Sequence, residues 1–150
     1  MPAANAKKWL IQDSSVLINT GTVAVPVWTE VEGINNVTLD PSVSDTDLTD
    51  FNSGGFTERY PVRRDATVNV TGYHMEDIAD GARPVGQAAV EAVRSLLGSA
   101  AIKQFRVLAP SAKGFMVPGY VNVTGPSGGV DDGASWGFVV TSAGQMVPVI

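Results

Sequence analysis

Residues 61–72 have the sequence PVRRDATVNVTG, and this stretch decides the fold class. Ala66, Val68 and Val70 alternate with polar or charged residues, so an extended chain here has one apolar face and one wet face. The alternation predicts a long strand over 56–73. A strand with one dry face and one solvated face is typical of an antiparallel sheet that covers a core on one side only.

Further strands are predicted before and after this one. A first strand is expected over 7–19, and a second over 23–34 with Val23, Val25, Val27 and Val31 on one face. The 16 glycines and 9 prolines lie between the Val- and Thr-rich runs, which indicates many short strands separated by turns. The chain is therefore expected to be mainly β. The three later strands are expected over 102–109, 115–124 and 134–141.

One α-helix is predicted over residues 84–97. Pro84 suits the start of a helix, and Gly98 is a suitable C-terminal stop. Gln87 falls on the expected polar face of this helix. The apolar stripe that we expect to pack on the chain's own sheet consists of Val85, Ala88, Ala92 and Leu96.

Between residues 40 and 59 the alternation disappears among serines, aspartates and glycines. This composition predicts a long loop. Loops of this length inside a compact domain are uncommon unless they are functional or disordered. Leu48 and Phe51 sit in the middle of the stretch, where a purely solvated loop would not need large apolar side chains.

Composition and length indicate one soluble, compact domain over residues 1–150, with short N-terminal and C-terminal arms. The chain is 44% hydrophobic and 17% charged, which is ordinary for a globular protein. No run approaches the roughly 20 apolar residues that a membrane helix needs, and residues 1–8 lack the apolar segment of a signal peptide. We therefore expect no membrane partner and a protein that starts inside the cell.

The sequence offers no catalytic or metal-binding constellation. The formal net charge of −5 disfavours a protein that holds nucleic acid by neutralising phosphates. The chain has no cysteine, and His74 is its single histidine, which leaves neither a His-based metal site nor the usual triads. The aspartates at 45, 47 and 50 lack the glycine and terminal glutamate of a calcium loop. No enzyme activity and no cofactor are expected.

Taken in order, seven segments resemble the major tail tube proteins of long-tailed phages. Each segment is degenerate by itself, so the resemblance is carried by the ordered set, which spans most of the chain. The segments are WTEVEGI (28–34), DTDLTDF (45–51), SGGF (53–56), PVRRDATVNVTG (61–72), the helix-to-strand passage 94–105, GYVNVT (119–124) and WGF (136–138).

The resemblance implies an antiparallel β-sandwich or half-barrel flanked by one helix. Such subunits assemble head to tail into hexameric rings, and their inner strands join into one continuous barrel around the channel for the genome. The implied partners are the chain itself and the tail tip, tape measure and tail terminator proteins, while DNA passes without specific binding. The implied location is the tail of the virion, assembled in the host cytoplasm.

The resemblance also implies roles for two groups of residues. We expect the free loop to be mobile, and we expect Leu48 and Phe51 to enter a pocket of an adjacent subunit on assembly. Nearby arginines would pair with a neighbour's carboxylates: Arg59, Arg63 and Arg64 with Asp45, Asp47 or Asp50. The residues expected to line the lumen are Glu30, Glu32, Thr67, Asn69 and Thr71.

Several alternatives stay open at this point. The wet strand faces suit either bulk solvent or a water-filled lumen, and the acids either repel DNA in a channel or keep the outer surface soluble. The chain fits the inner tube of a contractile tail or injection device equally well. A monomeric β-sandwich binding module is the alternative from a different class of function.

Overall fold

The computed structural model describes residues 8, 10, 13–130 and 133–149. The strands form one antiparallel sheet in the order β2-β1-β5-β6-β7-β4-β3, with β8 paired to β6. No helix in the described ranges is long and apolar enough to cross a membrane. The elements are β1 (Ser15–Asn19), β2 (Trp28–Glu30), β3 (Ile34–Asp47), the 3-10 turn η2 (Phe51–Ser53), β4 (Arg59–Tyr73), α1 (Val85–Val93), the 3-10 turn η3 (Gly98–Ala101), β5 (Lys103–Leu108), β6 (Gly114–Ser127), β7 (Ser135–Ser142) and β8 (Val147–Val149).

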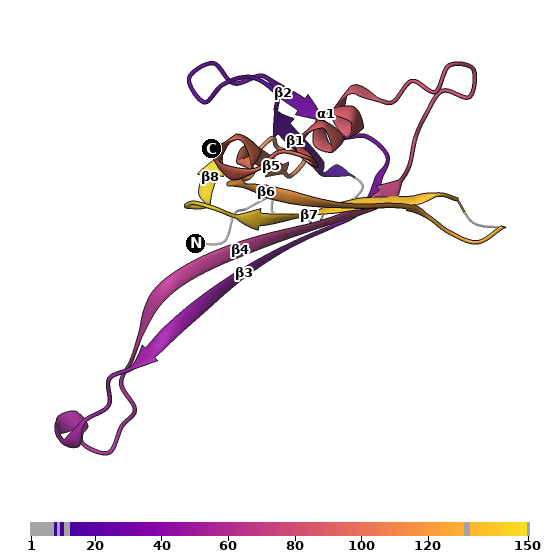
Figure 1. The fold of residues 1–150 in the computed structure, drawn as a ribbon. Helices are drawn as coiled ribbons and strands as arrows, with labels where there is room; N and C mark the ends of the chain where they lie inside the picture. Colours follow the sequence, from indigo (N-terminus) through magenta and orange to yellow (C-terminus); the bar gives the residue numbers. More distant parts are fainter. Residues whose placement is uncertain (1–7, 9, 11–12, 131–132, 150) are drawn as a thin grey trace.

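The sheet bends over itself without closing into a barrel. Figure 1 shows β1, β2, β5 and α1 on one side of the layer made by β6, β7 and β4, while β3 and β4 continue together well beyond this body. The predicted mainly β fold, an open antiparallel structure flanked by one helix, is confirmed. The strands expected at 102–109, 115–124 and 134–141 are also present as β5, β6 and β7. The strand expected over 7–19 is present only as β1. Residues 8, 10, 13 and 14 are not in a strand, and residues 7, 9, 11 and 12 lie outside the described residues.

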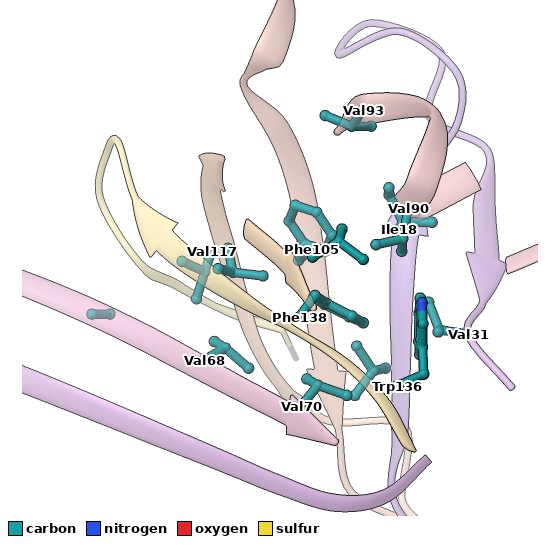
Figure 2. Close-up of a cluster of buried hydrophobic side chains, with 14 residues drawn as sticks. Ile18, Val31, Val68, Val70, Val90, Val93, Phe105, Val117, Trp136 and Phe138 are labelled. Atoms are coloured by element: carbon teal, nitrogen blue, oxygen red, sulfur yellow. The ribbon is translucent and has the colours of Figure 1, made fainter. Parts of the chain in front are cut away.

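The core lies between the two layers and is built mainly from valines and three aromatic rings (Figure 2). Val68 and Val70 of β4 are paired with Val140 and Phe138 of β7, so the alternating residues of both strands meet on one face. Phe138 is the centre of the aromatic group, with ring centroids 6.1 Å from Phe105 and 5.6 Å from Trp136. Burial of these apolar surfaces is the main stabilising contribution to the body.

The helix packs with a different face from the one predicted. Its buried residues are Gly86, Gln87, Val90 and Val93, whereas Val85 is 71% exposed and Ala88, Ala92 and Leu96 are exposed as well. A Cβ on Gly86 would collide with the carbonyl oxygen of Glu30, so glycine allows the helix to approach the backbone beside β2. The predicted apolar stripe is therefore wrong. The orientation of the helix is set by the close approach of Gly86 to the backbone of Glu30 and by polar contacts.

Gln87 is fully buried and supplies most of those polar contacts. Its Nε2 donates to the carbonyl oxygens of Glu32 (2.8 Å) and Tyr73 (2.9 Å). Its Oε1 accepts from the backbone nitrogen of Met75 (3.2 Å) and from Nη2 of Arg83 (2.7 Å). Because every polar atom of this amide has a partner, its burial carries little desolvation penalty.

A second part of the same network connects the helix to the core. Arg83 donates to one oxygen of Glu91 at 2.7 Å, and the indole nitrogen of Trp136 donates to the other at 3.0 Å. Burial opposes the charged form of Glu91, but these hydrogen bonds outweigh it and hold the pKa of the carboxyl below its usual range. The helix is thus tied to the strand layer by a hydrogen-bonded ion pair.

The strand expected over 23–34 is mostly a turn. Within this range only Trp28–Glu30 forms a strand before Ile34 begins β3. Val23, Val25 and Val27 are exposed, whereas Val31, expected on the same face, is buried. The buried side chain of Asn19 holds this turn by accepting from the backbone nitrogens of Gly21 (2.9 Å) and Val27 (3.0 Å). The prediction failed because these hydrogen bonds, rather than burial of the valines, determine the path of the chain.

The long loop expected over 40–59 is shorter than predicted. Strand β3 continues to Asp47 and pairs with β4 as far as Arg59, so the loop comprises only residues 48–58. The paired residues are exposed on both faces, and a strand with two wet faces shows no alternation that a sequence could reveal. The backbone ladder between the two strands maintains the extended conformation there.

Candidate assembly surfaces

The most prominent surface is a hairpin that projects from the body, which we call the arm and define as residues 40–65. Figure 1 shows it leaving the body along β3 and β4 and ending in the turn η2. Every residue of the arm is exposed except Ser53. An isolated two-stranded hairpin is at best marginally stable in water, so the arm gains little from its own packing.

The tip of the arm presents large apolar side chains to solvent. Leu48 is 56% exposed, Phe51 is fully exposed, and Phe56 is 77% exposed. The sequence singled out Leu48 and Phe51 as interface residues, and the structure places both at the farthest point from the core. Their contact with a neighbouring subunit stays a prediction.

Two of the aspartates predicted to pair with a neighbour also accept hydrogen bonds within the tip. The Asp50 carboxylate accepts from the backbone nitrogen of Asn52 (2.9 Å) and from the hydroxyl of Ser53 (3.2 Å). The Asp47 carboxylate accepts from the hydroxyl and the backbone nitrogen of Thr49, and these bonds lower the pKa of Asp47. Nowhere in the described ranges does a group of three or more His, Cys, Asp and Glu residues form a metal-binding cluster.

The arginines of the arm form no ion pair within their own subunit in the described ranges, although the charge of Arg59 contributes, after the hydrogen bonds from Thr49, to lowering the pKa of Asp47. Arg59 is paired in register with Asp47, Arg63 with Ser44, and Arg64 with Val43. Asp45 lies opposite Pro61 on the same hairpin. The pairing of these arginines with carboxylates of a neighbouring subunit stays a prediction.

The wet face of the sheet is a continuous polar surface across four strands. The registers place Thr38, Asn69, Val139 and Asn122 in one row. The adjacent rows contain Thr71 beside Asn36 and Thr67 beside Asp40, and Asp65 extends the same face by two positions. Thr67, Asn69 and Thr71, predicted to line a lumen, therefore share one surface of hydroxyl and amide groups with the carboxylates of Asp40 and Asp65.

Glu30 and Glu32 lie elsewhere. Both are exposed, and Glu30 ends β2, which lies at the opposite end of the strand order from β3 and β4. The structure does not bring these two acids together with Thr67, Asn69 and Thr71. Asp65 lies two residues before Thr67 on the same strand, so its side chain is expected on the same face. This spacing could have identified Asp65 in the sequence as an acid of the wet face.

Several strand edges are open within the described ranges: β2 and β8 each pair with one strand only, and two longer edges belong to β3 and β6. Strand β3 ends the sheet and pairs only with β4. Residues 114–119 of β6 pair with β5. The rest of β6, as far as Ser127, borders β7 on one side and has no strand on the side where β5 ends. An open edge carries unpaired backbone donors and acceptors that can bind a strand of another chain.

The sequence matches no protein-family model and no curated protein. Its structure, however, aligns over 93% of its length, with a TM-score of 0.66 and 18% identity, with a chain from the tail of an empty gene transfer agent (GTA) particle. The chain has the fold of a phage-like tail protein. That tail was determined with helical refinement and C6 symmetry, and the alignment covers 97% of the matched chain.

A second match comes from the virion of a native GTA particle. The TM-score is 0.60 with 19% identity, and the alignment covers 90% of this chain and 95% of the matched chain. The resemblance to phage tail proteins, drawn from degenerate sequence segments, is thereby confirmed at the level of the fold. The tail-protein fold includes the arm and the body, since both alignments cover most of the chain.

Proposed function

We propose that this chain is a structural, non-catalytic tail protein that polymerises as stacked hexameric rings into a tube for the passage of a genome. The observation that carries the proposal is the match to a helical, C6-symmetric tail over nearly the whole of both chains. Its proposed location is the virion, after assembly in the host cytoplasm. Its proposed partners are further copies of itself, with tail tip, tape measure and tail terminator proteins at the ends of the tube.

The open edges support the formation of a ring. The layer β6-β7-β4-β3 contains four antiparallel strands, so β3 and β6 at its two sides run in opposite directions. When β3 of one copy lies beside the free part of β6 in the next, the antiparallel alternation continues across the junction. A head-to-tail interface of this kind uses two different surfaces and can close into a ring.

The wet face supports a role as the lining of the channel. In a closed ring of such layers, one face points to the axis, and the polar face bearing Thr67, Asn69 and Thr71 suits a water-filled lumen. Asp40 and Asp65 give this face negative charge. Acids within roughly a Debye length, about 8–10 Å, of a duplex repel its phosphates, so DNA would slide without binding.

The open edge also argues against a monomeric binding module. Soluble monomers usually shorten, charge or cover a long edge strand, because an uncovered edge promotes association. Here β3 runs from Ile34 to Asp47 with no partner on its outer side in the described ranges. In a chain that assembles, a strand of the neighbouring subunit can pair with this edge.

Electron microscopy of the purified full-length chain tests the proposal. We expect rings or tubes with six-fold symmetry when the protein concentration is raised. A chain that stays monomeric by light scattering at every concentration, with no rings on the grid, would contradict the proposal and favour the binding module.

A matched pair of charge variants tests which face lines the channel. Asp40→Lys with Asp65→Lys should leave tubes formed but slow the ejection of DNA, because a cationic lining binds phosphates. Glu30→Lys with Glu32→Lys carries the same change of charge on a different surface and should not slow ejection from the tubes that form. The reverse result would assign the lumen to Glu30 and Glu32.

A further inference from the structure

A groove runs between the two layers on the open side of the half-barrel, and we call it the seam. Two cavities of about 550 and 530 Å³ form it, and they share Ser14 and Val37 as lining residues. Ile34, Val37 and Leu39 of β3 supply much of its apolar wall, and Glu30 and Glu32 lie at one end. The side chains of the three apolar residues are only partly buried within their own subunit. The seam is thus an apolar groove with an acidic end.

A second surface carries the complementary features. Immediately after α1, the segment 94–102 presents Leu96, Leu97 and Ile102, and Leu97 is 88% exposed. We call this segment the plug. The side chain of Arg94, which begins the plug, makes no hydrogen bond or ion pair within the described part of the chain. The plug is thus an apolar surface with a basic end.

The two surfaces border opposite edges of the layer β6-β7-β4-β3. The plug lies against Tyr120 and Val121, at the start of the part of β6 that lacks a strand on its outer side. The seam borders β3, the other open edge. Joining β3 of one copy to β6 of the next therefore brings the seam of the first subunit to the plug of the second.

The orientation of the side chains agrees with this placement. Leu39 pairs with Val68, and Val121 pairs with Val140, and both partners are buried in the core. Leu39 and Val121 therefore lie on the core-side face of the sheet, opposite to the polar face. The seam and the plug both lie on the core-side face of the sheet. In the proposed ring they therefore meet on the side of the sheet that faces away from the channel.

From these observations, and resting on the proposed ring, we infer that the plug of each subunit fills the seam of its neighbour. Leu96 and Leu97 enter the apolar groove beside Val37 and Leu39, and Arg94 meets the carboxylates of Glu30 and Glu32. The occupant of the seam is thus a second copy of this chain. This contact covers the two leucines that follow the end of the helix at Val93 and are exposed in the single subunit.

Substitutions at exposed plug residues test the contact without disturbing the fold. Leu97→Ala should raise the protein concentration needed for ring formation about tenfold or more, and Leu97→Asp should abolish rings, since a buried apolar anchor dominates an interface. Val85→Asp is the control, because Val85 is also largely exposed, at 71%, and lies on α1 outside the plug. Both the plug variants and the control should keep the thermal midpoint of the monomer.

Charge reversal adds specificity to the test. Arg94→Glu should weaken assembly, and the triple variant with Glu30→Lys and Glu32→Lys should restore it, because the pairing is then present with reversed signs. Failure of the triple variant to assemble better than Arg94→Glu alone would contradict the proposed pairing.

Cross-linking identifies the partner residues directly, because the native chain has no cysteine. A mixture of Leu97→Cys and Val37→Cys proteins, assembled and treated with a short thiol cross-linker, should yield covalent dimers, and the double variant should yield a ladder of oligomers. The mixture of Val85→Cys and Val37→Cys should yield neither.

The outcomes separate this inference from the proposed function. Rings that form normally with Leu97→Asp, and show no cross-link between positions 97 and 37, would overturn the plug while leaving the ring intact. A wild-type chain that forms no rings would overturn both.

Discussion

The body and the arm of this protein are held in shape by different means. In the body, buried valines and aromatic rings fill the space between two layers of one folded sheet. In the arm, only Ser53 is buried, and large apolar side chains at the tip face solvent. The body therefore covers its apolar groups within a single chain, whereas the arm exposes large apolar groups that its own subunit does not cover. The variants below test this contrast.

Loss of an aromatic side chain from the body should have the largest effect on folding. Phe138 packs against Phe105 and Trp136 and is almost completely buried. Phe138→Ala should lower the free energy of unfolding by about 3–5 kcal/mol, because it removes apolar burial and leaves a cavity. Denaturant unfolding of the monomer measures this value. A change below about 1 kcal/mol would mean that the core is not where the structure places it.

The buried amide of Gln87 should matter nearly as much. Gln87→Leu keeps a similar volume but leaves the carbonyls of Glu32 and Tyr73 and the nitrogen of Met75 without partners. We expect a loss of about 2–4 kcal/mol in the free energy of unfolding. Ala88→Gln, at an exposed position of the same helix, is the control and should leave stability unchanged. Equal stability of both variants would show that the amide network does not hold the helix.

The ion pair beside this amide should give the body a pH dependence. The pKa of Glu91 is lowered from about 4.5 in the fold, so its contribution to stability is complete above that pH and is lost as the pH falls through the folded value. The advantage of the wild type over Glu91→Gln in unfolding free energy should therefore shrink below pH 4.5. A constant difference between the two proteins from neutral to acidic pH would contradict the assignment.

The tip of the arm should have the smallest effect on folding. Phe51→Ala should change the free energy of unfolding by less than about 0.5 kcal/mol, because the ring has no contact partner to lose in the monomer. The same variant should abolish polymerisation if the tip docks on a neighbour. Unfolding of this variant, or normal tube formation, would place Phe51 outside the interface.

The sequence predicted the parts of the fold in which burial is one-sided. In β4, β6 and β7, one face meets the core and the other meets water, so alternation at positions such as Val68 and Val70 is visible in the sequence. The arm is exposed on both faces, and nothing in its composition distinguished a strand from a loop. The face of α1 was missed because burial of Gln87 depends on backbone partners from β4 and the β2–β3 connection, far away in sequence.

The candidate surfaces were predictable to a similar extent. Leu48 and Phe51 were identified because large apolar residues stood out in a polar stretch, and Thr67, Asn69 and Thr71 because they alternate with valines. The separation of Glu30 and Glu32 from these residues follows from strand order, which no local pattern encodes. The open seam likewise results from how two edges of the sheet face each other.

Hydrogen–deuterium exchange on the monomer and on the assembled tube tests the difference between body and arm most directly. We predict fast exchange in the monomer from Asp45 to Gly55 and along the outer side of β3, with strong protection of both in the tube. The amides of β7 should be protected equally in the two states, which provides an internal control. Equal protection of the arm in monomer and tube would contradict the account, because the arm would then be stabilised within its own subunit.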